Sequence, residues 1–330
     1  MALLHLEVLP ADGGTRLDRW LARQLSIASS RAAELCATGK VRIRGKTCSP
    51  HRKLFGGEAV EVERPASRAP SALGPDLAVL HDDAACLVID KPADLPVEPA
   101  GPRSTSVVGA ASRLGAFSVA GGAAPGLAHR LDRDTTGCLL LARTDAALVA
   151  LRKAFEAGLV EKDYLALVAV AGVGLPDAGT LDTAYGRDPA DPRRYTTRLR
   201  SARRARLSFR VEERLAGNQA ALLRVRLDTG RTHQIRVQLA EAGWPVLGDA
   251  TYGVASPVIG RQALHAARLS FPSPLGAQVV VLAPLPADLA AAIQTLKAAG
   301  HLQAAALGPS SERTLGSSQA GTDSPRDATE

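Results

Sequence analysis

Short apolar runs constrain the fold of this chain more than any other feature. Each run is too short for a buried helix. Each is also rich in Leu, Val or Ala, which is typical of strands buried inside a sheet. The runs are CLVID (86–90), CLLLAR (138–143), YLALVAV (164–170), ALLRVRL (221–227) and QVVVLA (278–283). Residues 147–158 and 286–300 instead carry apolar residues at helical spacing. The pattern predicts one mixed α and β domain over residues 76–300.

A smaller unit is expected in residues 1–64. Residues 16–25 and 29–39 have the spacing of two short amphipathic helices. KVRIRGK (40–46) and GGEAVEVE (56–63) alternate apolar and polar residues, as strands with one buried face do. The strand at KVRIRGK would therefore show a basic face to solvent.

Two further segments lack apolar periodicity. Residues 65–75, PASRAPSALGP, are rich in Pro, Ala and Ser, which indicates a linker. Residues 301–330 end the chain, and from Gly308 onward they are mostly Ser, Gly, Thr, Pro and charged residues. Because so few apolar side chains cannot offset the entropy lost on ordering, this tail is predicted to be disordered.

Charge and composition narrow the partners. The chain has 40 Lys plus Arg against 33 Asp plus Glu, a formal charge of +7, which favours a polyanionic partner. No stretch approaches the roughly 18 apolar residues of a membrane helix, and the amino terminus lacks the pattern of a signal peptide. The four cysteines form no C-x-x-C pair. We expect a cytoplasmic monomer with reduced thiols and no membrane association.

Reactive side chains concentrate in HRLDRDTTG (129–137), just before an apolar run, and in TGRTHQIR (229–236). A salt-bridged turn would explain the first cluster without any chemistry. If Ile235 packs on the core, however, Arg236 is drawn inward and needs a carboxylate. Asp132 is a natural candidate, and an adjacent arginine would keep it ionised.

A single tyrosine stands at the front of another apolar run. Tyr164 lies in EKDYLAL (161–167), where its ring could simply fill the core while the hydroxyl reaches the surface. The alternative is a ring that faces a site.

Together and in this order, these segments resemble the RluA-type pseudouridine synthases over roughly residues 76–290. LVIDKPADLPV near the start, LAEAGWPVLGDATYG after the arginine cluster and RQALHAARLSF near the end fit the same pattern. The resemblance implies an α+β fold whose mixed, largely antiparallel sheet is flanked by helices. It also implies isomerisation of uridine to pseudouridine in structured RNA, without a cofactor or a metal.

The resemblance further implies roles for individual residues. Asp132 would be the catalytic carboxylate, Tyr164 would stack on the base, and Arg236 would hold Asp132. Arg130 would lie near the space left by the extracted nucleotide, while Arg231 and His233 would shape the loop or contact RNA. A base stacked in RNA cannot reach such a site, so the target must flip out of the stack.

The amino-terminal unit resembles the small alpha-L RNA-binding module found on ribosomal proteins and on many of these synthases. The resemblance implies RNA contacts from the basic residues Arg31, Lys40, Arg42, Arg44 and Lys46. A dimerisation or linker domain is the alternative. The module favours large-subunit ribosomal RNA as substrate, with transfer RNA as the other possibility.

The chain departs from the family pattern at three positions. Glu98 and Trp244 stand where histidines are common, and Thr136 stands where serine is common. These departures affect the expected substrate more than the expected activity.

Residues 193–214 contain nine Arg and two Glu, a net charge of +7, and are the best candidate for a surface that follows the phosphate backbone. A solvated basic strand is the bland alternative. Two other functions compete with catalysis by Asp132. They are a noncatalytic RNA-binding or ribosome-assembly factor, and a metallohydrolase built on His129, His233 and His265.

Overall fold

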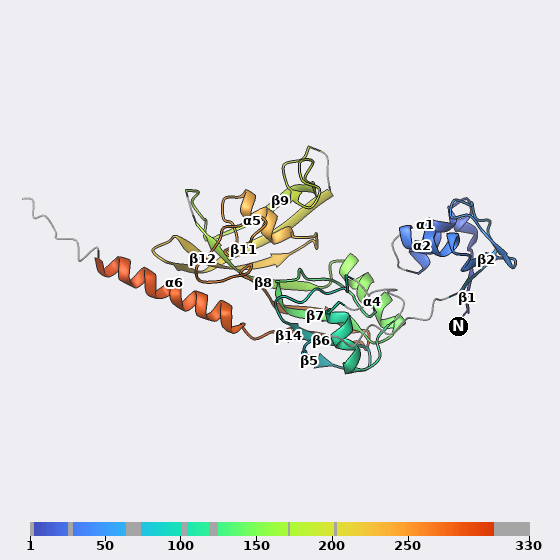
Figure 1. Ribbon diagram of the computed structural model, residues 1–330, viewed down its shortest axis with the longest axis horizontal. Helices are drawn as coiled ribbons and strands as arrows, with labels where there is room; N and C mark the ends of the chain where they lie inside the picture. Colours follow the sequence, from blue (N-terminus) through green and yellow to red (C-terminus); the bar gives the residue numbers. More distant parts are fainter. Residues whose placement is uncertain are drawn as a thin grey trace, which may run out of the picture.

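The computed structural model describes residues 3–25, 29–63, 74–100, 104–118, 125–170, 172–200 and 203–306. Most of the predicted linker (65–73) and the tail beyond residue 306 lie outside these ranges. The side chain of Arg31 is also outside the described part. Figure 1 shows two separate bodies, a small amino-terminal one in blue and a larger one in green to orange.

The small body is a four-stranded antiparallel sheet, in the order β1-β4-β2-β3, with two helices. Its elements are β1 (Leu3–Glu7), α1 (Leu17–Gln24), α2 (Ser29–Ala37), β2 (Val41–Ile43), β3 (Lys46–Thr47) and β4 (Ala59–Glu63), with a 3-10 turn at Pro10–Asp12. Val41 and Ile43 are buried in the same core as Trp20, whereas Arg42 between them is exposed. The predicted strand with one basic face is thus present.

The large body is built on a ten-stranded sheet in the order β10-β9-β11-β12-β8-β13-β7-β6-β5, with β14 paired to β13. The strands are β5 (Ala78–Asp82), β6 (Cys86–Lys91), β7 (Thr136–Ala142), β8 (Glu161–Ala169), β9 (Ala178–Arg187), β10 (Tyr195–Thr196), β11 (Arg203–Leu215), β12 (Ala220–Leu227), β13 (Leu264–Pro272) and β14 (Gln278–Leu282). Within the described ranges only β7 and β13 pair in parallel. The predicted mixed, largely antiparallel sheet is confirmed.

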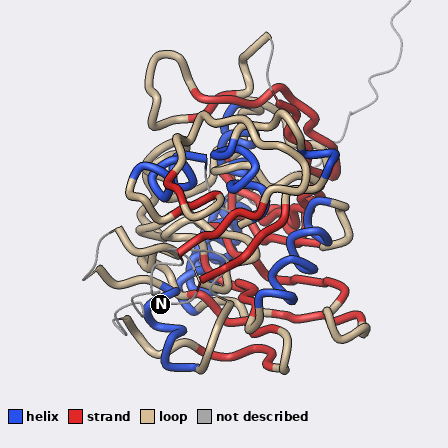
Figure 2. Tube along the Cα trace, turned by 90° about the vertical axis from the view of Figure 1, so that its right-hand side faces the viewer, coloured by secondary structure: helices blue, strands red, loops and turns tan. Residues whose placement is uncertain are grey.

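Helices lie beside this sheet (Figure 2). They are α3 (Val107–Ala111), with a 3-10 turn at Ser112–Leu114, α4 (Asp145–Glu156), α5 (Gln234–Glu241) and α6 (Ala287–Ala306). Thr144 caps α4 by accepting a hydrogen bond from the Ala147 amide at 3.1 Å, and Leu148 and Leu151 are buried against the sheet. No helix in the described ranges is long and apolar enough to cross a bilayer.

Two expectations from the sequence are wrong in detail. Helix α6 continues to Ala306, so the first six residues of the predicted disordered tail are helical. The run at 278–283 was expected to be a buried strand, yet Val280 and Leu282 are 54% and 67% exposed. The reason is position, because β14 pairs only with β13 and lies off the main order of the sheet.

Gly137 allows β7 and β13 to approach each other directly after the 129–135 loop. Its φ is +106°, and a Cβ at this position would lie 2.2 Å from the carbonyl oxygen of Ala266. Both the backbone conformation and the close approach therefore require glycine.

We expect Gly137→Ala to destabilise the protein by about 1–3 kcal/mol more than Gly158→Ala, because overpacking adds to backbone strain. Gly158 is the matched control: it has a φ of +72°, and a methyl group there would meet no atom within 4 Å. Urea denaturation followed by circular dichroism measures both variants. Equal losses of stability would show that the contact between β7 and β13 can relax.

Candidate active site

The loop that carries Asp132 is anchored at several points. The Lys91 ammonium donates hydrogen bonds to the carbonyls of Arg133 (2.6 Å) and Pro92 (2.7 Å). Arg261 donates to the carbonyl of Asp134 at 3.0 Å. Backbone carbonyls held by fixed cations cannot shift freely, so the loop presents Asp132 in one position.

Lys91 is an anchor that the sequence analysis missed. Its side chain is fully buried, and burial lowers its pKa to about 8, although the carboxylate of Asp134 opposes that shift. It is therefore largely a cation at neutral pH. The sequence does contain one indication of this role, because Lys91 directly follows the apolar run at 86–90. A lysine drawn into the core there needs several hydrogen-bond acceptors.

Arg236 lies at the start of α5, next to Ile235, which is buried in the core. Its Nη1 donates to Oδ2 of Asp132 at 3.0 Å, so the predicted ion pair is confirmed. Its Nε and Nη2 donate to the two carboxylate oxygens of Asp249 at 2.6 and 2.8 Å. One guanidinium therefore binds two carboxylates.

Asp249 is the second residue that the sequence analysis missed. Its side chain is fully buried and also accepts hydrogen bonds from the amides of Thr251 (2.8 Å) and Tyr252 (3.1 Å). Burial alone would raise the pKa of Asp249, but the hydrogen bonds and charge of Arg236 outweigh it and the pKa is lowered. A lone carboxylate in the mostly apolar segment 244–250 was the signal for a buried cation nearby.

His233 lies on the other side of Asp132. It begins α5 in the left-handed region with a φ of +58°, and its Nε2 is 3.8 Å from Oδ1 of Asp132. Its Nδ1 lies 3.0 Å from the hydroxyl of Tyr252. Burial lowers the pKa of His233, although the negative charge of Asp132 opposes that shift. The lowered pKa favours the neutral imidazole.

Asp132 and Tyr164 share a narrow cleft. Its cavity is about 50 Å³, enough for only a few waters, and its lining also includes Arg130, Arg231, His233, Arg236 and Leu264. Tyr164 is buried, and burial together with the charge of Asp132 raises the pKa of its phenol well above the usual value. The hydroxyl therefore stays neutral. The Arg130 side chain is 66% exposed and pairs with Glu98 at 3.4 Å, so it can swing away from the cleft.

The basic residues predicted in the amino-terminal unit lie elsewhere. Arg42, Arg44 and Lys46 are exposed around β2 and β3, and Lys40 is half-buried. None of these four lines the cleft around Asp132. The structure thus separates the predicted residues into a cleft and a distinct basic surface.

The arginine-rich segment 193–214 is less positive than its composition suggests. Six of its nine arginines form ion pairs with acidic side chains, namely Arg193, Arg198, Arg204, Arg206, Arg210 and Arg214. Among the described residues, Arg194, Arg200 and Arg203 have no such partner. Much of the predicted charge is therefore neutralised within the protein.

The histidines of the metallohydrolase alternative have separate partners. His129 accepts a hydrogen bond from the amide of Leu140 at 3.0 Å, and burial lowers its pKa to about 3. His265 lies 2.9 Å from the hydroxyl of Thr136, and His233 lies against Tyr252. These contacts explain each imidazole without a shared ion.

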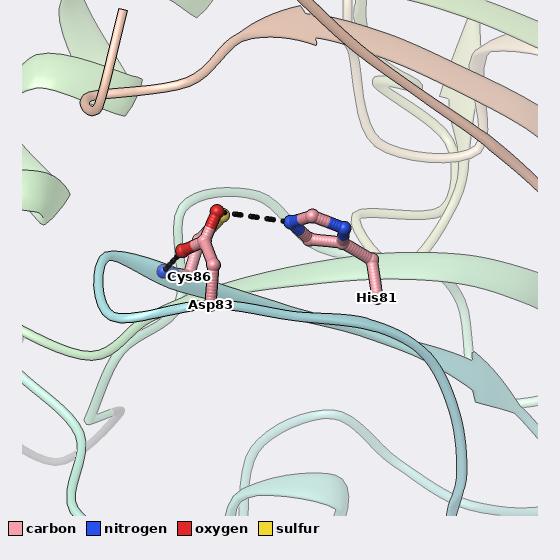
Figure 3. A group of neighbouring side chains, drawn as sticks. All are labelled: His81, Asp83 and Cys86. Carbon is pink, nitrogen blue, oxygen red and sulfur yellow. Dashed lines mark hydrogen bonds and ion pairs between the residues drawn. The ribbon is translucent and has the colours of Figure 1, made fainter. Parts of the chain in front are cut away.

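One other group has suitable metal ligands, the hairpin residues His81, Asp83 and Cys86. Figure 3 shows the Asp83 carboxylate between the His81 ring (3.0 Å) and the backbone nitrogen of Cys86 (2.7 Å). Burial raises the pKa of the Cys86 thiol to about 12, which opposes formation of the thiolate that binds metals. The group forms a hydrogen-bonded turn at the start of β6, whereas Lys91 lies at the end of that strand.

We expect Asp249→Asn to lower the free energy of unfolding by about 3–5 kcal/mol at pH 7, because it leaves the Arg236 charge with one partner fewer in a buried site. The folded-state pKa of Asp249 is depressed, so its stabilisation is present above the unfolded value of about 3.9 and is lost as the pH falls through the folded value. Urea unfolding at several pH values measures the difference from the parent.

That difference should shrink below about pH 4. Asp191→Asn is the control, because Asp191 pairs with Arg193, which is 90% exposed, and its removal should change stability little. A pH-independent difference for Asp249→Asn would contradict the assigned ion pair.

Comparison with known proteins identifies the family. A model of the RNA pseudouridylate synthase family matches residues 85–241. The chain is 35% identical over 313 residues to the ribosomal large subunit pseudouridine synthase D of Xanthomonas campestris pv. campestris, covering 89% of this chain and 93% of that protein. It is 36% identical over 300 residues to an uncharacterized RNA pseudouridine synthase of Chloroflexus aurantiacus, covering 88% and 92%.

A solved structure agrees with this result. Human RNA pseudouridylate synthase domain containing 1 superposes with a TM-score of 0.54 at 27% identity, covering 65% of this chain and 87% of that one. The similarity extends over nearly the full length of the bacterial relatives and includes the segments that form the cleft. The chain therefore belongs to the RluA-type family of RNA pseudouridine synthases, enzymes that isomerise uridine in RNA.

Proposed function

We propose that this enzyme converts specific uridines of large-subunit ribosomal RNA to pseudouridine, with Asp132 as its catalytic carboxylate. The observation that carries the proposal is the cleft lined by both Asp132 and Tyr164, in which Arg236 donates a hydrogen bond to Asp132. The choice of RNA rests on the bacterial relatives whose names specify the ribosomal large subunit. The proposal includes the cytoplasmic location and the monomeric state expected from the sequence.

The reaction requires a carboxylate beside the ribose and a dry site around the base. The bond between N1 of uracil and C1′ breaks, the base rotates, and C5 forms a new bond to C1′ while the proton on C5 leaves. Oδ2 of Asp132 accepts from Arg236, and no described residue donates a hydrogen bond to Oδ1. Oδ1 is therefore the oxygen available to the substrate.

Tyr164 and Arg130 would contact the flipped nucleotide. The neutral ring of Tyr164 offers an aromatic surface on which uracil can stack. Because the cavity beside it holds only about 50 Å³, a base can enter only if exposed side chains move. Arg130 meets that need, since its contact with Glu98 is long and solvent-exposed.

We expect Asp132→Asn to abolish turnover while leaving RNA affinity within a few-fold, because the amide keeps the volume but not the charge. The measurement is pseudouridine mapping in a large-subunit ribosomal RNA transcript incubated with each purified protein. Asp134→Asn, the same change two residues along the loop, should retain activity. Pseudouridine formation by Asp132→Asn near the parent rate would overturn the assignment.

We also propose that residues 1–64 form an RNA-binding module that raises affinity without building the cleft. The exposed side chains of Arg42, Arg44 and Lys46 support phosphate contacts on one side of that unit. None of the residues that the structure describes in this unit lines the cleft. Such a module would act by raising the effective concentration of RNA at the cleft.

Deleting residues 1–64 should weaken RNA affinity and make its salt dependence shallower, because phosphate contacts release counterions. The single-turnover rate at saturating RNA should stay within a few-fold of that of the full chain. Filter binding over a salt series and quench-flow measure the two quantities. A truncated enzyme that binds normally but lacks the chemical step would show that the unit helps to build the active site.

A further inference from the structure

A second groove lies beside the cleft and has no part in the mechanism described above. It encloses about 530 Å³ and is lined by Tyr185, Gly186, Arg187, Tyr195, Leu199, Arg203, Gly230, Arg231 and Thr232. These residues come from β9, β10, β11, the segment between β10 and β11, which contributes Leu199, and the loop before α5. The volume is within the usual range for small-ligand sites.

The charge of this groove is uncompensated. Arg187, Arg203 and Arg231 are exposed, and none of them forms an ion pair with a described carboxylate. Most arginines of the neighbouring segment 193–214 do pair with acids. Of the described residues that line the groove, none is acidic, so the groove is a concentrated positive site suited to a phosphate.

The groove also contains an aromatic surface. The rings of Tyr185 and Tyr195 stack with centroids 5.3 Å apart and planes at 14°. The guanidinium of Arg187 lies 5.0 Å from the centroid of Tyr195. Tyr185 is buried and donates its hydroxyl proton to the carbonyl of Thr232, which fixes the pair. The exposed guanidinium of Arg187, supported by the half-buried ring of Tyr195, therefore offers a flat surface for a nucleobase.

The groove is connected to the cleft of Asp132. Arg231 lines both, so a strand that fills the cleft passes directly along the groove. The His233 and Tyr195 rings also contact each other in a T-shaped arrangement, with centroids 5.8 Å apart. We infer that this groove binds one unpaired nucleotide next to the target uridine, with its phosphate at Arg203 and Arg231 and its base on Tyr195 and Arg187.

This inference rests on the proposed RNA substrate and adds a determinant of which uridine is chosen. A uridine flanked by a nucleotide that can leave the stack would fit both sites, whereas one held in a continuous duplex would not. The groove thus selects for single-stranded flanking sequence rather than for a base pair.

The test measures binding of a nine-nucleotide oligouridylate by fluorescence anisotropy. Arg203→Gln should weaken binding at least about threefold and reduce the slope of log affinity against log salt by about one. Tyr195→Leu should weaken binding at least about fivefold with little change in that slope, since stacking is lost rather than a phosphate contact. Tyr195→Phe keeps the ring and should bind like the parent.

Arg210→Gln is the matched control, because Arg210 lies on β11 with Arg203 but pairs with Glu212 and does not line the groove. It should bind within about twofold of the parent. Thermal unfolding of every variant verifies the fold. Binding by Arg203→Gln and Tyr195→Leu that matches Arg210→Gln would overturn the inference. Pseudouridine formed by the parent in a ribosomal RNA transcript tests the proposed function separately, because oligouridylate binding does not depend on turnover.

Discussion

The guanidinium of Arg236 joins three segments of the chain, and the one that carries Asp132 lies 104 residues away in the sequence. It binds Asp132 from the loop before β7 and Asp249 from the loop after α5, while its own backbone belongs to α5. Its side chain is only 6% exposed, and that of Asp249 is fully buried. A buried cation between two carboxylates is stable only when its geometry is satisfied, so each segment must occupy its place.

The rest of the large body supports that geometry. Gly137 lets β7 approach β13 immediately after the Asp132 loop, and Lys91 at the end of β6 holds the same loop by the carbonyl of Arg133. Arg261 holds the loop from just before β13. Three strands therefore fix one short segment. Catalytic carboxylates need such support, because misplacement by about 1 Å can cost on the order of a hundredfold in rate.

Apolar runs predicted five of the ten strands described in the large sheet, but not β5, β9, β10, β11 or β13, in which polar residues interrupt the apolar ones. Strands β6, β7, β8 and β12 follow continuous apolar runs, and α4 follows helical spacing with a Thr cap. Strand β14 was predicted as a strand but not as an exposed one, because an apolar run does not reveal whether a strand lies inside the sheet or pairs on one side only. The predicted helix also ended too early, because Gly300 favours a helix end whereas the following residues, HLQAAA (301–306), continue α6.

The candidate site was partly predictable for a similar reason. Arg236 follows Ile235, and an arginine drawn into the core beside a buried residue needs a carboxylate partner. Its pairing with Asp132 could therefore be predicted. Lys91 could not be assigned, because its partner Arg133 lies 42 residues away and only the folded chain brings the two together. Asp249 could not be assigned either, because the sequence does not show that Arg236 binds a second carboxylate besides Asp132. The ion pairs of the arginines in 193–214 could not be predicted either, because five of their six acidic partners lie outside that segment.

Arg236→Lys tests the central claim most directly, because lysine keeps the positive charge but cannot bind two carboxylates with one planar group. The measurement is the single-turnover release of tritium from a ribosomal RNA transcript labelled at C5 of uridine, which reports departure of the C5 proton. We expect a folded protein with RNA affinity within a few-fold of the parent and a rate lower on the order of a hundredfold. Release within twofold of the parent rate would show that Asp132 does not depend on the two-carboxylate clamp.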